Sequence, residues 1–131
     1  MRVMLDTNVL ISAIMFPNAR MDSLIFKATL DHQLVLSSLI IDELLDVTKR
    51  KFPQKIKDVD LFLVRLPYEL IYTPREQDND FFNIRDIDDY PILYSAIIEE
   101  IDLFVTGDDD FFDVEIEKPE IITPAEFLEK Y

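Results

Sequence analysis

Two short apolar runs, far apart in the sequence, each lead directly into an acidic residue. The run 3–5 leads into Asp6, and the run 103–106 leads through Gly107 into Asp108. Neither run alternates apolar with polar side chains, which is typical of strands buried on both faces in a parallel sheet. In such sheets, ligands bind beyond the carboxyl ends of the strands. We therefore expect the two acids to meet at one edge of a sheet.

Strand patterns alternate with helical patterns along the whole chain. Strands are predicted at 3–5, 34–36, 70–72, 103–106 and 121–122, and helices at 9–15, 21–30, 39–50, 53–66, 92–100 and 124–130. Ser38 is the expected N-cap of the helix over 39–50, and the polar segment 75–88 is expected to be a loop. The pattern predicts one domain over residues 1–131, with a three-layer α/β/α fold around a mainly parallel sheet of about five strands.

The composition excludes several classes of protein. Cysteine is absent, which rules out disulfides and thiolate zinc sites. Gly107 is the only glycine, so glycine-rich nucleotide-binding loops are excluded as well. No apolar stretch approaches the roughly 18 residues that span a bilayer, and Asp6 and Asn8 interrupt any signal-peptide core. We expect a cytoplasmic protein that does not associate with membranes.

Four acids fall near the ends of predicted elements: Asp6, Glu43, Asp89 and Asp108. Each has an ordinary interpretation, because an aspartate beside a strand or before Pro91 often caps a helix, and a helical glutamate is usually solvated. Together they indicate a shared site, since clustered carboxylates repel one another unless protons or cations intervene. Magnesium and manganese prefer such oxygen ligands. The net charge of −14 otherwise disfavours nucleic-acid binding, which depends mainly on lysine and arginine.

Nearly the whole chain resembles the PIN domain, a family of metal-dependent ribonucleases, because its motifs occur in the same order. The segment MLDTNVLISA resembles the family's opening strand and Asp-x-Asn motif, and LSSLIIDELLDV resembles the segment that holds its glutamate. The segments RDIDDYPILYSAI and LFVTGDDDFF are similar to its later acidic half, and IITPAEFLEKY to its usual ending. Within the family, the chain most resembles toxins of bacterial and archaeal toxin–antitoxin pairs.

The resemblance implies an endoribonuclease that hydrolyses RNA phosphodiesters with one or two Mg²⁺ or Mn²⁺ ions. The implied catalytic and metal-binding acids are Asp6, Glu43, Asp89 and Asp108. Asp86 and Asp88 compete with Asp89 for the third of these positions, and Asp89 is preferred for its spacing to the helix that follows. Auxiliary roles are expected for Asn8, Asp86 and Asp110, with Thr106 and Ser12 orienting carboxylates. The stretch Glu99-Glu100-Ile101 stands where relatives often have a glycine, which is expected to affect only a turn.

The sequence indicates the residues that contact substrate and partner less clearly than it indicates the acids. Lys49, Arg50 and Lys51 belong to a basic stretch suited to the RNA backbone, although a solvated helix end explains them equally well. The single histidine, His32, is expected at the surface. At least one phenylalanine of each pair, Phe81-Phe82 and Phe111-Phe112, is expected to be buried. The resemblance also implies a small antitoxin partner and a homodimer.

Two other functions stay open at this point. One is an RNA-binding or interaction module that keeps the fold and has lost catalysis. The other is a different magnesium-dependent phosphoryl-transfer enzyme, such as a haloacid-dehalogenase-like phosphatase. That class needs an aspartate two residues after the first acid, where this chain has Asn8.

Overall fold

The computed structural model describes residues 1–131, and a parallel sheet of five strands lies at its centre. The order across the sheet is β3-β2-β1-β4-β5, and every neighbouring pair runs parallel. From β1 the chain adds β2 and β3 on one side, and then β4 and β5 on the other. This reversal creates a topological switch point between β1 and β4, where ligands of parallel sheets characteristically bind. The strands are β1 (Arg2–Leu5), β2 (Gln33–Ser37), β3 (Glu69–Ile71), β4 (Leu103–Val105) and β5 (Glu120–Ile122).

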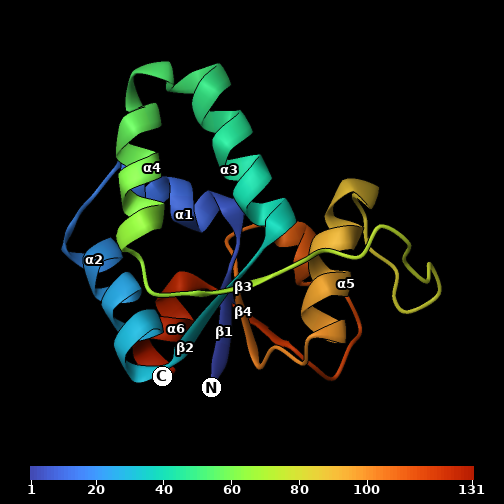
Figure 1. Cartoon of the computed structure of the whole chain (residues 1–131). Helices are drawn as coiled ribbons and strands as arrows, with labels where there is room; N and C mark the ends of the chain where they lie inside the picture. The colour runs from blue at the N-terminus through green and yellow to red at the C-terminus, as the bar shows by residue number, and fades with distance from the viewer.

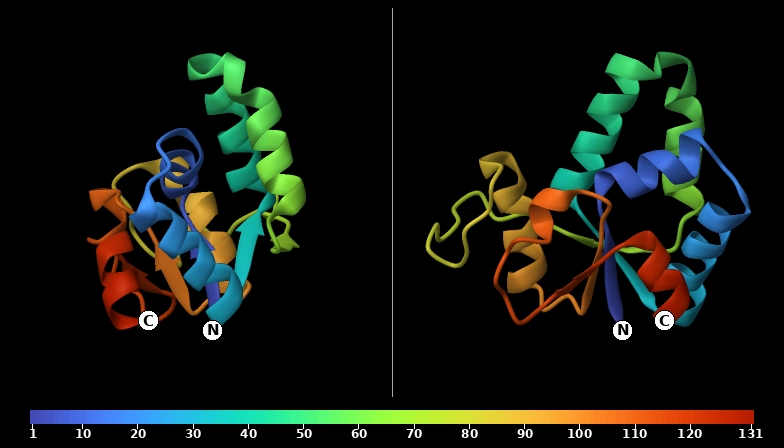
Figure 2. Two further views of the ribbon diagram at one scale, coloured as in Figure 1. Left: turned by 90° about the vertical axis from the view of Figure 1, so that its left-hand side faces the viewer. Right: turned by 180° about the vertical axis from the view of Figure 1, so that it is seen from behind.

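Six α-helices surround this sheet. Helices α2 and α6 lie on one side of the sheet and α5 on the other, while α3 and α4 extend beyond the carboxyl ends of the strands (Figures 1 and 2). No helix is both long enough and apolar enough to cross a membrane. The helices are α1 (Thr7–Met15), α2 (Ala19–Phe26), α3 (Ser38–Lys51), α4 (Ile56–Arg65), α5 (Tyr90–Ile98) and α6 (Pro124–Lys130). A π-helical turn, η1 (Lys27–Asp31), and three 3₁₀ turns, η2 (Pro53–Lys55), η3 (Ile87–Asp89) and η4 (Asp109–Phe111), complete the structure.

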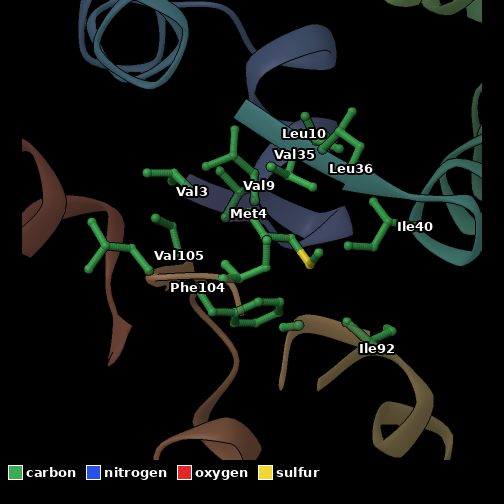
Figure 3. Packing of buried hydrophobic residues seen from close by; sticks show 14 of the residues in the cluster. Val3, Met4, Val9, Leu10, Val35, Leu36, Ile40, Ile92, Phe104 and Val105 are labelled. Carbon is green, nitrogen blue, oxygen red and sulfur yellow. The ribbon is translucent and has the colours of Figure 1, made fainter. Parts of the chain in front are cut away.

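One cluster of 27 buried residues forms the hydrophobic core. Met4, Val35 and Phe104 of the three central strands are fully buried, and Leu10 and Ile92 of the flanking helices belong to the same cluster (Figure 3). Burying a side chain of this size contributes about 1.5–3 kcal/mol. The uninterrupted apolar runs in the sequence therefore correspond to strands covered on both faces, as predicted.

The start of α3 differs from the prediction. Ser37, and not Ser38, is the N-cap, because the Ser37 hydroxyl accepts a hydrogen bond from the Ile40 N–H at 3.2 Å. The Ser38 hydroxyl instead accepts the Thr73 N–H at 3.0 Å. Ser37 therefore caps α3, and Ser38 binds the backbone of the chain that follows β3.

The region between α1 and β2 also departs from the prediction. The expected single helix over 21–30 begins earlier, with Asn18 as its N-cap, and changes into the π-helical turn η1. His32, expected at the surface, packs against Phe127 and Tyr131 with ring centroids 5.7 and 6.4 Å away. Both of its ring nitrogens are buried. The surface prediction was wrong because α6, distant in sequence, docks over this turn.

Two smaller expectations agree with the structure. Phe82 and Phe111 are buried while Phe81 and Phe112 are exposed, so one phenylalanine of each pair packs in the core. Glu100 has a positive φ of 55°, a conformation that glycine adopts more readily than other residues. The departure from the glycine of relatives is therefore accommodated in the turn before β4.

Asp102 joins the amino ends of three strands. Its Oδ2 accepts the Arg2 N–H at 2.7 Å, and the Lys118 Nζ lies 3.1 Å from its Oδ1. Its backbone N–H donates to the Arg2 carbonyl, and its carbonyl accepts the Glu120 N–H. The hydrogen bond from Arg2, together with Lys118, lowers the pKa of the Asp102 carboxyl below its ordinary 3.8.

We predict that Asp102→Asn lowers the melting temperature at neutral pH by a few degrees, since a hydrogen bond to a charged group contributes on the order of 1–2 kcal/mol. A lowered pKa in the folded state adds stability above pH 3.8, and this stability is lost as pH falls through the folded-state value. The difference between variant and wild type should therefore narrow below about pH 4 in thermal unfolding monitored by circular dichroism.

The matched control is Glu69→Gln, which removes the exposed ion pair with Arg2 at 2.8 Å and should change the melting temperature less. A loss of stability in Asp102→Asn that is equal at neutral and acidic pH would contradict the assigned role of the carboxylate.

Candidate metal centre

Four acids from separate segments line one cavity at the carboxyl edge of the sheet. Asp6 follows β1, Glu43 lies on α3, Asp89 immediately precedes α5, and Asp108 follows β4. The cavity has a volume of about 310 Å³. The structure thus brings together the four acids that the sequence singled out. Its other lining residues are Thr7, Asn8, Asp46, Val47 and Arg50.

Asp6 is held by hydrogen bonds from both sides of the switch point. Its Oδ1 accepts the Thr7 N–H at 2.8 Å, which caps α1, and its Oδ2 accepts the Thr106 hydroxyl at 2.7 Å. The Thr106 hydroxyl in turn accepts the Asp108 N–H at 3.0 Å, so one threonine connects both strand-end acids. Asp6 is only 5% exposed. Burial raises the pKa of its carboxyl in spite of these hydrogen bonds, and the nearby Asp108 raises it further.

Glu43 is positioned by a residue that the sequence interpretation missed. The Thr7 hydroxyl donates a hydrogen bond to Glu43 Oε2 at 2.9 Å, so Thr7 joins α1 to α3 beside the cavity. Partial burial raises the pKa of the Glu43 carboxyl; the hydrogen bond from Thr7 opposes that shift, and Asp6 and Asp88 add to it. The only signal for Thr7 in the sequence was a hydroxyl directly after the first acid.

Asp89 has the most perturbed carboxyl in the site. Burial, followed by repulsion from Asp108, Asp86, Asp6 and Asp110, raises its pKa from 3.8 to about 7. It precedes α5 without making a side-chain capping hydrogen bond, so helix capping does not account for this aspartate.

Asp86 and Asp88, the two acids that compete with Asp89 for the third ligand position, lie outside the four-acid cavity. Asp86 caps the turn η3 by accepting the Asp88 N–H at 3.0 Å, and Asp88 is exposed. Of the three, only Asp89 lines the four-acid cavity. Asp86, Asp89 and Asp110 nevertheless bring carboxylate oxygens within 4.8 Å of one another. Asp86 and Asp110 therefore extend the acidic cluster beyond the cavity.

The remaining predicted residues divide between two cavities. Asn8 and Asp108 line both the four-acid cavity and a neighbouring cavity of about 590 Å³, which also contains Ser12 and Asp110. Among the basic candidates, Arg50 lines the four-acid cavity, whereas Lys49 and Lys51 are exposed and line neither cavity.

The donor set fits a divalent cation that prefers oxygen. The acids that line the cavity offer carboxylate oxygens, and neither histidine nor cysteine lines it. Burial, with repulsion from neighbouring acids, raises the pKa values of Asp6, Glu43 and Asp89. Such a cluster matches the ligand preference of Mg²⁺ and Mn²⁺.

Comparison with known proteins identifies the family and the fold of this chain. The family model described as PIN domain matches residues 2–110. A chain in the crystal structure of VapBC2 from Rickettsia felis, bound to a DNA fragment from its promoter, is similar in fold with a TM-score of 0.67. The two chains share 20% sequence identity over 93% of this chain and 97% of the other. A search of curated proteins found no match. The predicted three-layer fold is confirmed, and the chain belongs to the PIN-domain family.

Proposed function

We propose that this protein is a metal-dependent endoribonuclease that hydrolyses RNA phosphodiester bonds at the four-acid cavity. The principal support is the convergence of Asp6, Glu43, Asp89 and Asp108 on one cavity at the switch point of the sheet. PIN-domain proteins are generally nucleases, so membership in the family narrows the chemistry to phosphodiester hydrolysis. Asn8 lies in the cavity at the position where a phosphatase of the alternative class needs an acid.

The four acids are the proposed ligands of one or two Mg²⁺ or Mn²⁺ ions, which polarise a phosphoryl oxygen and lower the pKa of water when bound. Thr106 and Thr7 hold the carboxylates of Asp6 and Glu43 in place by direct hydrogen bonds, so little reorganisation is needed on binding. The single histidine lies under α6 and not in the cavity, which leaves the carboxylates as the titratable groups at the reaction centre.

We propose further that a small antitoxin protein is the partner, as in the toxin–antitoxin branch of the family. The similarity in fold to a chain of the VapBC2 structure supports this. A groove of about 510 Å³ between α2, η1 and α4 supplies a suitable surface, since Phe26, Leu30 and Leu61 expose 63%, 70% and 47% of their area there. Contiguous exposed apolar surface of this kind marks protein interfaces. The homodimer stays a prediction, which light scattering on the purified chain will test.

We predict that Asp6→Asn and Asp108→Asn each reduce RNA cleavage roughly a hundredfold or more, because each removes a proposed ligand of an ion that contributes several kcal/mol. Asparagine caps helices about as well as aspartate, so α1 should persist in the Asp6 variant. Cleavage of a labelled RNA should require manganese or magnesium and stop with chelator.

The control variant is Asp42→Asn, which neutralises an exposed acid next to Glu43 on α3 that does not line the cavity. It should cleave RNA like the wild type. Full activity in both test variants would overturn the site. RNA binding by the wild type without metal-dependent cleavage would instead indicate an inactive RNA-binding module.

We predict that the metal-free protein becomes more stable as pH falls from about pH 8 to about pH 5. The pKa of Asp89 is about 7 when folded and 3.8 ordinarily, so the folded state takes up a proton in this interval while the unfolded chain stays ionised. Asp89→Asn should raise the metal-free melting temperature near pH 8 and flatten its pH dependence. Differential scanning calorimetry in chelator measures both effects, and a wild-type melting temperature that falls across this interval would contradict the prediction.

We predict that Leu30→Glu relieves inhibition by the antitoxin and leaves RNA cleavage itself unchanged, since Leu30 lines the apolar groove and lies outside both acidic cavities. The inhibitor to use is the product of a small reading frame adjacent to the gene. Ile98→Glu, which places the same charge on an exposed position of α5, is the matched control. Inhibition that is equal for wild type and Leu30→Glu would argue against this groove as the docking surface.

A further inference from the structure

The two cavities at the carboxyl edge of the sheet lie on either side of a shared wall. Asn8 and Asp108 line both the four-acid cavity and the larger neighbouring cavity. The larger cavity is also lined by the apolar side chains Val9, Met21 and Pro124. The proposed reaction centre is therefore one part of a longer depression, and not an isolated pocket.

Each of the two cavities is lined by a single cationic side chain. Arg50 lines the four-acid cavity and Arg85 lines the larger one. Arg85 is one of only two basic residues in the segment 76–120, which contains sixteen acids. A phosphate that approaches the depression is attracted by these two guanidinium groups and repelled by the acids around them.

Both arginines are oriented by neighbouring acids and remain open to solvent. The Arg50 Nε lies 3.1 Å from Asp46 Oδ2, and its side chain is 58% exposed. The Arg85 guanidinium lies 3.2 Å from Asp110 and 2.6 Å from Asp113, and its side chain is 67% exposed. Exposed ion pairs of this kind contribute little to stability. Because a guanidinium has five N–H donors, each arginine keeps donors for a phosphate while it contacts its acid.

We infer that Arg50 in the four-acid cavity and Arg85 in the larger cavity hold the backbone of one RNA strand on the two sides of the Asn8–Asp108 wall, so that the strand crosses this wall beside the proposed metal ligands. This inference rests on the proposed ribonuclease function and extends it from the reaction to the placement of the substrate. A single strand is favoured because the acidic surroundings repel the second phosphate backbone that a duplex would bring to the site. An unpaired base can also contact the apolar wall of the larger cavity, formed by Val9, Met21 and Pro124.

The test is steady-state cleavage of a labelled single-stranded oligoribonucleotide and of its duplex, at a manganese concentration that saturates each variant. Arg50→Gln and Arg85→Gln should each raise KM about fivefold to tenfold with kcat little changed, as expected for loss of a partly exposed charged hydrogen bond that is made equally before and during reaction. The slope of log KM against log salt concentration should fall by about 0.7 for each arginine removed. The double variant should show the product of the two effects, since the sites do not share partners.

Matched controls separate a local contact from a general charge effect. Lys130→Gln makes the same charge change on α6, where Lys130 pairs with Glu126 at 3.6 Å, and Arg75→Gln makes it in the segment before η3; both residues are exposed and line neither cavity. Arg50→Lys and Arg85→Lys should retain the salt slope and recover part of the KM, which a purely structural role of the arginines does not predict.

The possible outcomes distinguish this inference from the proposed function. Arginine variants that change KM no more than the control variants, or that lower kcat at constant KM, would overturn the placement of the strand, and so would equal cleavage of single strand and duplex. Failure of the wild type to cleave any RNA with manganese would instead contradict the ribonuclease proposal itself.

Discussion

The burial of Asp6 at the carboxyl end of β1 is the constraint on which the rest of the site depends. A buried carboxylate is unfavourable unless hydrogen bonds compensate it, and here they come from the Thr7 N–H and the Thr106 hydroxyl. Because Thr106 directly follows β4, the same contact fixes the relative position of two strand ends. Thr7 then extends the arrangement to Glu43 on α3. A network of two threonines and three acids, with Asp108 held through Thr106, therefore depends on one buried side chain.

The acids that form the proposed reaction centre also lower the stability of the folded protein. Burial and repulsion from neighbouring acids raise the pKa values of Asp6, Glu43 and Asp89, so keeping these carboxyls ionised near neutral pH lowers the stability of the metal-free protein. The proposed binding of a divalent cation would relieve this repulsion and so link ion binding to folding. Away from the site, acids have structural tasks. Asp102 stabilises the opposite edge of the sheet, and its pKa is lowered by the Arg2 N–H and Lys118. The pKa of Asp102 is therefore shifted in the opposite direction to those of Asp6 and Asp89.

Much of the fold was predictable from local pattern. The uninterrupted apolar runs predicted the parallel strands, and Pro124 with the residues that follow predicted α6 with its bounds. The predictions failed where two neighbouring residues suited the same role almost equally, or where an element distant in sequence packed against the segment. Ser37 and Ser38 are both competent caps, and the docking of residues after β3 decided between them. His32 lies in a segment of ordinary turn composition, and the packing of α6 against it explains why its ring nitrogens are buried.

The sequence by itself determined that Asp6 and Asp108 would follow two buried strands and that Asp89 would precede a helix, because apolar runs specify these elements. The sequence also favoured Asp89 within the group 86–89, and the structure places Asp89 in the cavity. Tertiary structure alone decided that Thr7 orients Glu43, and that Arg50 rather than Lys49 or Lys51 lines the cavity. The physical reason is that these choices depend on the rotation of each helix about its axis and on its distance from the sheet. Those quantities arise from packing between segments remote in sequence, and local residue patterns carry no information about them.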